Sequence, residues 1–316
     1  MYSYENRLSI NFKIPLKLVN MDQPKQNMVN GRFQMLELIN DGSHGKVYKG
    51  YDIVMKTDVA IKCDYHSNPA VMMREAQMLE KLADVDGIPQ IFWHGFYSEQ
   101  YVIVMQLMGK DFREIMSEVT MTVTDVMKLA VQVIGIFKNI HSRGLIHKDC
   151  KLENIMMGCG KDKNKVYLVD FGLAEKFIIN GEHIPMAKVR LRTGAPVFAS
   201  LNNHKKRRQS RRDDLQSIGY VFLAMLKDGY DDLPWDAVTD GRQATFKDIY
   251  AKKASLGPKE LFDGFPKAFT QFMAYAMQLN YKDQPDYEYL QGLFRLEIWR
   301  AGHTNDVLSA DFDFNG

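Results

Sequence analysis

The sequence is poor in cysteine, in long hydrophobic runs and in net charge. Its 316 residues include 3 cysteines, an odd number that fits free thiols in a reducing compartment better than a disulfide framework. No stretch approaches the ~18 consecutive apolar residues that a membrane helix needs, and the N-terminus lacks the continuous apolar core of a secretory signal. We therefore expect a soluble protein of the cytoplasm, the nucleus or both, with no membrane span.

The weak net charge also limits the kinds of partner. A formal charge of +2 gives no general attraction to nucleic acid or to a membrane surface, so we expect no nucleic-acid partner. Contents of 46% hydrophobic and 25% charged residues are ordinary for a globular protein. Cys63 and Cys150 have no evident base partner and are interpreted as packing residues, not as nucleophiles.

The pattern along the chain indicates an extension over residues 1–28 and two regions of different structure. Residues 29–107 contain β-branched and aromatic runs separated by turn residues, which predicts five strands. Met72, Ala76, Leu79 and Ala83 recur on one face of a predicted helix over residues 71–83. The extension could add an edge strand. Residues 108–316 are predicted to be mainly helical, with helices at 124–144 (N-cap Thr124, C-cap Gly144), 213–226, 245–253, 267–279 and 287–301.

Two short motifs carry the chemistry. In HKDCKLEN, the residues His147, Asp149, Lys151 and Asn154 place a proton-accepting carboxylate, a cation and a metal-binding amide on one loop. The DFG motif then supplies Asp170 as a second metal ligand. Together they describe a site that moves a phosphoryl group from a magnesium-bound nucleotide to a hydroxyl. Asp149 would accept the proton, Lys151 would neutralise phosphoryl charge, and Asn154 and Asp170 would hold Mg²⁺.

A glycine-bearing turn is expected to meet the phosphates. Residues 40–45 read NDGSHG, and Gly42 and Gly45 would let backbone N–H groups approach the ligand. The usual pattern G-x-G-x-x-G has Asn40 in place of its first glycine. Such a turn alone is more often an ordinary hairpin, so the interpretation depends on Val47 and on the VAIK run that follows.

The VAIK run, residues 59–62, is predicted to line the nucleotide site. Ala60 would lie against the adenine and Lys62 would point toward the α- and β-phosphates. An inward-pointing lysine in mid-strand is costly unless it is paired, and Glu75 on the following helix is its natural partner. A surface lysine and an unrelated surface glutamate are the alternative, which the nearby catalytic motif disfavours.

At these residues the chain resembles the eukaryotic protein kinases, and three further segments make it similar to the casein kinase 1 family. They are TGAPVFASLNNH at 193–204, QSRRDDLQSIGYV at 209–221 and PDYEYLQGLF at 285–294. The resemblance runs from about residue 30 to the C-terminus. It implies an α+β, bilobal protein-kinase fold: a small five-stranded antiparallel N-lobe with one helix, over residues 29–107, and a larger, mainly helical C-lobe that follows the hinge, over residues 108–316.

The resemblance also implies a function and a fuller site. It indicates a monomeric serine/threonine kinase that uses ATP and Mg²⁺, acts on acidic or already phosphorylated protein sites, and needs no phosphorylation of its activation segment. Asp214 would brace the catalytic loop, Met105 would be the gatekeeper, and the hinge would begin at Gln106. The expected ATP-binding residues are Ile39, Gly42, Ser43, Gly45, Val47, Ala60, Lys62, Glu75, Met105, Gln106, Met108 and Met156.

Several positions depart from that family's pattern. Lys148 replaces an arginine before Asp149, and Ala195 replaces a threonine that supports the catalytic Asp and Lys. Val197 stands where the family has an arginine for the priming phosphate, and Glu175 replaces a lysine nearby. Kinase activity is still expected, but the use of phosphorylated substrates is an open question. The remaining candidate anion ligands are Lys176 and Arg190.

The segment HKKRRQSRR, residues 204–212, holds six lysines and arginines and has three interpretations. Lys205, Lys206, Arg207 and Arg208 could form a solvated loop, a dock for acidic substrates, or a nuclear-import patch. We hypothesise that acidic substrates are preferred.

Two other functions compete with a protein kinase. A nucleotide-binding pseudokinase scaffold is supported only by Asn40, Lys148 and Ala195. A kinase of small molecules with a related fold would not be expected to carry QSRRDD or Lys151.

Overall fold

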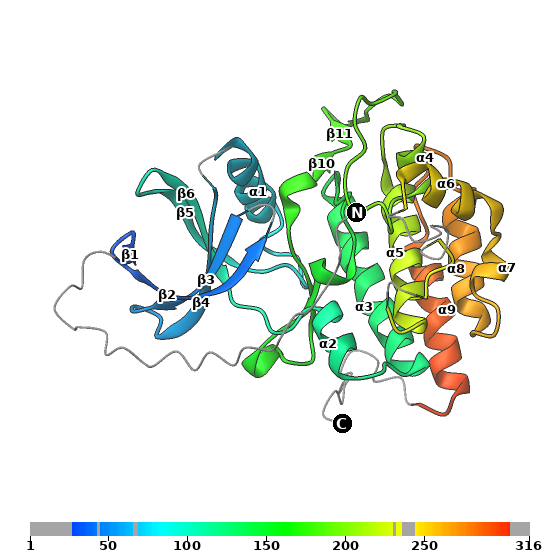
Figure 1. The fold of residues 1–316 in the computed structure, drawn as a ribbon, viewed down its shortest axis with the longest axis horizontal. Helices are drawn as coiled ribbons and strands as arrows, with labels where there is room; N and C mark the ends of the chain where they lie inside the picture. The colour runs from blue at the N-terminus through cyan, green and yellow to red at the C-terminus, as the bar shows by residue number, and fades with distance from the viewer. Residues whose placement is uncertain (1–26, 43–44, 66–68, 230–231, 236–243, 304–316) are drawn as a thin grey trace, which may run out of the picture.

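The computed structural model describes residues 27–42, 45–65, 69–229, 232–235 and 244–303, and it shows two lobes joined by a short connection (Figure 1). A sheet and one helix form the smaller, N-terminal lobe, and most helices lie in the larger lobe. The predicted α+β, two-lobed arrangement is confirmed. Among the described helices, none is both long enough and apolar enough to cross a membrane.

The sheet of the N-terminal lobe is antiparallel throughout, in the order β1-β2-β3-β4-β6-β5. The five predicted strands are all present, but a two-residue strand, β1, adds a sixth at the edge of the sheet. The rest of the proposed N-terminal extension, residues 1–26, lies outside the described residues. The strands are β1 (Met28–Val29), β2 (Phe33–Gly42), β3 (Gly45–Asp52), β4 (Thr57–Cys63), β5 (Ile91–Tyr97) and β6 (Gln100–Gln106).

Helix α1 (Pro69–Lys81) packs against β5 and β6. The helix buries Met72 and Leu79, as its apolar spacing predicts. It ends two residues earlier than expected, so Ala83 is exposed and Leu82 is buried instead. Glu75 lies among the buried residues of α1, and a buried carboxylate needs a cation.

The C-terminal lobe is built around α5. This helix is buried continuously from Arg212 to Met225, and α3 and α8 both pack against it. A helix that is buried on all sides is held by neighbours in every direction, so α5 is a fixed base for the loops above it. The helices of this lobe are α2 (Phe112–Glu118), α3 (Val123–Ser142), α4 (Leu201–His204), α5 (Arg211–Leu226), α6 (Phe246–Ser255), α7 (Pro258–Leu261), α8 (Lys267–Gln278) and α9 (Tyr287–Arg300).

The start of α3 corrects one prediction. The N-cap is Thr122, not Thr124, because the Thr122 side chain accepts the backbone N–H of Asp125 and Asp125 returns a hydrogen bond. The predicted C-cap is also one residue off, because the helix ends at Ser142 with Arg143 as its C-cap, and Gly144 follows in the left-handed region with φ +72°. The short elements that follow carry the site: β7 (Leu145–Ile146), η1 (Leu152–Asn154), β8 (Ile155–Met157), η2 (Gly160–Asp162), β9 (Val166–Leu168), η3 (Phe171–Leu173), β10 (Glu175–Lys176), β11 (Ile178–Ile179) and β12 (Glu182–His183).

Candidate active site

Asp214, near the start of α5, fixes the backbone of the loop that follows β7. Its Oδ2 accepts the N–H of His147 at 2.8 Å, and its Oδ1 accepts the N–H of Lys148 at 2.8 Å. Burial would raise the pKa of Asp214, but the hydrogen bonds from the His141 ring and from the backbone N–H of Lys148 outweigh burial and lower it. The ionised carboxylate therefore anchors the loop from below, as the resemblance implied. Lys148, held in this way, has φ +71°.

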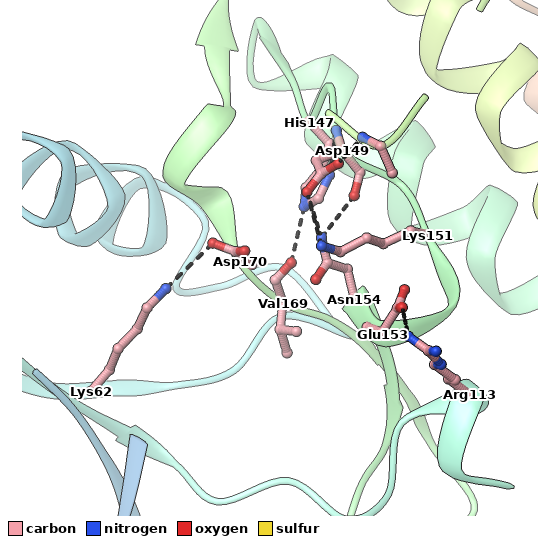
Figure 2. Close-up of polar contacts among 10 residues, drawn as sticks. Lys62, Arg113, His147, Asp149, Lys151, Glu153, Asn154, Val169 and Asp170 are labelled. Carbon is pink, nitrogen blue, oxygen red and sulfur yellow. Dashed lines mark hydrogen bonds and ion pairs between the residues drawn. The ribbon is translucent and has the colours of Figure 1, made fainter. Parts of the chain in front are cut away.

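Asp149 lies at the centre of the site with its carboxylate oriented from two sides. Its Oδ1 accepts the backbone N–H of Ala195 at 3.0 Å, and its Oδ2 accepts a hydrogen bond from Asn154 at 3.2 Å. The Nζ of Lys151 is 3.5 Å from the same Oδ2 (Figure 2). Asp149 is 5% exposed, so the carboxylate is held in one place beside a cation.

The two motifs are joined by packing between His147 and Phe171. Their rings meet edge to face with centroids 4.9 Å apart, and the Nε2 of His147 hydrogen-bonds with the carbonyl of Val169 at 3.0 Å. Phe171 is buried. Both residues set the position of the loops and do not face the reaction, which agrees with their interpretation as packing residues.

Lys62 is paired with Glu75, as predicted. Its Nζ is 2.7 and 2.8 Å from the two carboxylate oxygens of Glu75 and 3.3 Å from Asp170. Burial alone would lower the pKa of Lys62, but the charges of Glu75 and Asp170 outweigh burial and raise it. The lysine is thus a permanent cation that links the two lobes at the floor of the site (Figure 2).

The residues predicted to hold a metal fit a magnesium ion that is shared with a nucleotide. The amide nitrogen of Asn154 donates to the backbone carbonyl and the carboxylate of Asp149, which leaves its oxygen as the ligating atom. Asp170 supplies a carboxylate at a left-handed position, φ +62°. Within the described ranges no three His, Cys, Asp or Glu side chains gather to hold a metal. Mg²⁺ commonly takes only one or two carboxylates and completes its shell with phosphates and water.

The predicted adenine-side residues fall on neighbouring strands. Ala60 is opposite Met105 across β4 and β6, and Val47 is opposite Lys62 across β3 and β4. Met156 lies on β8 in the C-terminal lobe, so the predicted adenine site draws residues from both lobes.

The chain around the predicted hinge is fixed by side chains of the C-terminal lobe. Gln106 donates to the Tyr167 hydroxyl at 3.3 Å. The Cys159 thiol donates to the carbonyl of Leu107 at 3.2 Å. The hinge residue Met108 directly follows this carbonyl.

The predicted phosphate turn is only partly described. Gly42 and Gly45 are opposite each other where β2 and β3 meet, and Ile39 on β2 is 49% exposed. Ser43 lies outside the described residues. At Gly45, φ is +134° and an added Cβ would come within 2.2 Å of the Cys63 carbonyl. This glycine is therefore required for the start of β3 to approach the end of β4.

Gly194 and the backbone of Ala195 are functional features that the sequence alone did not identify. Gly194 has φ +78°, and an added Cβ would lie 2.6 Å from the carbonyl of Lys148 and 2.9 Å from the Asp149 carboxylate. Ala195 lacks the hydroxyl that a threonine would contribute, yet its N–H still donates to Asp149. The only signal in the sequence is the glycine itself, within TGAPVFASLNNH.

The model of the protein kinase domain family matches residues 33–286. The chain belongs to this family. The match extends from the first residue of β2 to the N-cap of α9 and so includes both lobes and the whole site. The family's reaction transfers a phosphoryl group from ATP to protein, with the help of a divalent metal.

Two departures from the casein kinase 1 pattern form an ion pair with each other in this kinase domain. The Nζ of Lys148 is 2.9 Å from the carboxylate of Glu175, which starts β10. The Lys148 side chain is 14% exposed and that of Glu175 is 43% exposed. The cation beside Asp149, the predicted catalytic residue, is therefore neutralised from within the chain. Val197, another of the departures, packs against the core of the C-terminal lobe.

The predicted anion ligands are only partly brought together. Residues 187–189 run antiparallel to residues 206–208: Lys188 bridges Arg207, and the N–H of Val189 donates to the carbonyl of Lys206. Arg190 therefore directly follows the stretch that pairs with the basic segment. Lys176, in contrast, lies on β10 beside β7.

The basic side chains of that segment do not all face solvent. Arg208 donates to the carbonyl of Pro185 at 3.2 Å, and the Lys205 ammonium lies 5.6 Å from the ring centroid of Tyr250. Lys205, Lys206 and Arg207 are nevertheless exposed, and Arg208 is half-buried. Across the described ranges, no ion pair involves any of the predicted anion ligands Lys176, Arg190, Lys205, Lys206, Arg207 and Arg208.

The two cysteines nearest the site are buried thiols. Burial raises the pKa of Cys63 to about 11 and raises the pKa of Cys150 well above its ordinary value. Both therefore remain protonated near neutral pH, which agrees with their interpretation as packing residues.

Proposed function

We propose that this chain is a serine/threonine protein kinase of the casein kinase 1 type, which transfers the γ-phosphate of Mg-ATP to Ser and Thr hydroxyls of proteins. The observation that carries the proposal is the fixed carboxylate of Asp149, oriented by Ala195 and Asn154 with Lys151 beside it. A carboxylate held in this way can accept the proton of an incoming hydroxyl.

The other site residues have roles that fit phosphoryl transfer. Lys151 would neutralise charge on the transferred group, and Lys62, oriented by Glu75, would hold the α- and β-phosphates. Mg²⁺, when bound through Asn154 and Asp170, would neutralise the phosphate oxygens. Such catalysis consists mainly of positioning and electrostatics, so each of these groups is expected to affect the rate strongly.

The test is phosphate transfer from Mg-ATP to casein by the wild type and by Asp149→Asn, side by side. The variant should lose on the order of 10²-fold or more in kcat while it still binds ATP, because Asp149 is not a nucleotide ligand. Phosphoamino-acid analysis of the product separates Ser and Thr from Tyr. ATP binding without transfer to any substrate would instead favour a pseudokinase scaffold.

Activity without phosphorylation of the activation segment is part of the proposal. The ion pair between Lys148 and Glu175 supports it, because the carboxylate already occupies the place where an external phosphate would meet this cation. Pretreatment with a phosphatase should then leave kcat unchanged. A large loss after such treatment would show that an added phosphate is required.

A preference for acidic substrates is also proposed. The exposed Lys206 and Arg207 and the neighbouring Arg190 support it, since clustered cations attract acidic chains. Reversing the charge of Lys206 and Arg207 should raise KM for an acidic peptide severalfold, and added salt should reduce the difference. The matched control reverses the charge of Lys161 and Lys163, which lie on η2 and the residue after it. Equal KM values in the two double variants would contradict the proposal.

Peptides that are acidic, phosphorylated or neutral upstream of the acceptor separate two modes of recognition. Preference for the phosphorylated peptide would mean that priming survives the replacement at Val197.

We further propose a monomer that resides in the cytoplasm, the nucleus or both. Light scattering and microscopy of a tagged chain test these two points.

A further inference from the structure

A cavity of about 580 Å³ opens on the C-terminal lobe between the end of α3, the start of α5 and the start of α9. None of the residues that line it is predicted to bind ATP, metal or protein substrate. Its volume falls within the range of small-molecule sites, roughly 300–1,000 Å³. The lining combines an aromatic wall, Phe177 and Tyr287, with the cations Lys138, Arg143 and Arg211.

A chain of hydrogen bonds leads from this cavity to the catalytic loop. The Tyr287 hydroxyl is 2.5 Å from Nδ1 of His141, and Nε2 of His141 is 2.9 Å from Oδ2 of Asp214. The same carboxylate accepts the backbone N–H groups of His147 and Lys148. His141 and Asp214 therefore connect Tyr287, on the cavity wall, to the residue before Asp149.

The direction of each hydrogen bond in this chain can be assigned. Burial lowers the pKa of His141 more than the Asp214 carboxylate raises it, so the ring is neutral and carries one proton. An ionised carboxylate only accepts, which places that proton on Nε2. Nδ1 is then an acceptor, and the Tyr287 hydroxyl must donate to it. A group in the cavity that competed for the Tyr287 proton would leave Nδ1 of His141 without a donor.

Arg211 gives the cavity its charge preference. The lysine and the other arginine in the lining have carboxylate partners, Lys138 with Glu288 and Arg143 with Asp84. Arg211 instead donates to the carbonyl of Lys282, and its guanidinium lies 4.7 Å from the ring centroid of Phe177. Among the described residues it has no carboxylate within ion-pair distance. It is the cation most available to an incoming anion.

We propose that this cavity is a regulatory site for a small organic anion that carries an oxyanion on an aromatic body. Arg211 and Tyr287 bind the oxyanion, so that the Tyr287 hydroxyl donates its hydrogen bond to the ligand and no longer to His141. The aromatic body occupies the cavity, and the oxyanion accepts from the guanidinium and the phenol. The support that His141 gives to Asp214 is weakened, and the catalytic loop loosens. The expected result is a lower kcat at an unchanged KM for ATP.

Binding is tested by isothermal titration of the whole chain with 2-naphthoate, with 2-naphthyl phosphate and with neutral 2-naphthamide. Both anions should bind at least tenfold more tightly than the amide, and the tighter of the two identifies carboxylate or phosphate as the natural group.

Arg211→Gln should weaken binding of both anions at least tenfold and leave binding of the amide unchanged. Ser142→Trp, which fills the cavity from its rim, should abolish binding of all three. Equal binding of amide and anions, or anion binding that persists in both variants, would overturn the proposal.

Coupling to the catalytic loop is tested by hydrogen exchange, which does not require the chain to be active. Saturating anion should speed exchange of the His147 and Lys148 amides severalfold, because both are protected by Asp214. Tyr287→Phe should speed exchange without any ligand and should remove the ligand's effect. kcat should follow the same pattern. Binding with no change in exchange at these two amides would show that the cavity is not coupled to the loop.

Discussion

Gly194 shows how one residue can decide the geometry of the site without taking part in the chemistry. Its left-handed φ, +78°, turns the chain so that the N–H of Ala195 meets Asp149. An added methyl group would come within 2.9 Å of the Asp149 carboxylate and 2.6 Å of the backbone behind it. Both the conformation and the close approach favour glycine.

Gly194→Ala should lower kcat on the order of 10-fold to 100-fold, because the carboxylate must move and loses the N–H of Ala195. KM for ATP should change little, since no predicted nucleotide ligand lies in this segment. The matched control is Gly181→Ala, where φ is +83° but an added Cβ meets nothing within 4 Å. Steady-state kinetics and thermal unfolding of the two variants separate conformational strain from contact with Asp149. Equal losses of activity would mean that strain alone is responsible.

The limits of reading the sequence are clear at this position. Asp149, Lys151, Asn154 and Asp170 were predicted from two motifs, because each motif fixes chemistry on a few consecutive residues. The contact between Gly194 and Asp149 joins segments that are distant in the chain, and no local spacing encodes it. The replacement at Ala195 suggested a lost hydrogen bond, but a backbone group provides one.

At the scale of elements, the apolar periodicity predicted which helices and strands exist better than where they begin. Thr122 and Thr124 are both acceptable caps by type, and only the reciprocal bond with Asp125 decides between them. The sequence allowed an edge strand in the extension but did not locate it, because the two residues of β1 carry little pattern and form a strand by pairing with β2. Contacts made in the folded structure therefore decide the start of α3 and the existence of β1, which the local sequence does not determine.

Helix α6 is tied to the substrate side of the site by a lysine that no motif indicated. Lys253 is 0% exposed and donates to the carbonyls of Ala199 at 2.8 Å and Pro196 at 3.3 Å. Its Nζ also lies 4.1 Å from the ring centroid of Tyr220. The segment it holds is the one that presents Ala195 to Asp149, so α6 is expected to position this segment.

Lys253→Met should raise KM for a protein substrate severalfold and leave KM for ATP nearly unchanged. Methionine fills a similar volume but leaves two buried carbonyls without their donor, which costs about 1–3 kcal/mol for each group. Lys252→Met, one residue earlier and half-buried, is the matched control. Kinetics with each substrate varied in turn provide the measurement. A fall in kcat alone, with both KM values unchanged, would contradict a role in positioning the substrate segment.

At the scale of the whole molecule, buried histidines link stability to pH. Burial, together with the charges of Lys253 and Arg192, lowers the pKa of His204 to about 3, whereas an unfolded histidine has a pKa near ~6.5. The folded state therefore resists protonation over a range in which the unfolded state binds a proton. His141 and His183 are shifted in the same direction, mainly by burial.

The sign of the effect follows from these shifts. The stability that depends on neutral His204 is complete above pH ~6.5 and is lost as the pH falls toward about 3, at up to about 1.4 kcal/mol per pH unit for one group. Between pH 6 and 5 the free energy of unfolding of the wild type should therefore fall more steeply than that of His204→Phe. The ring exchange keeps the contacts with Phe246 and Tyr250, and any packing cost is the same at every pH. Urea unfolding of both proteins across this range measures the two slopes, and parallel lines would show that His204 is not a source of the acid sensitivity.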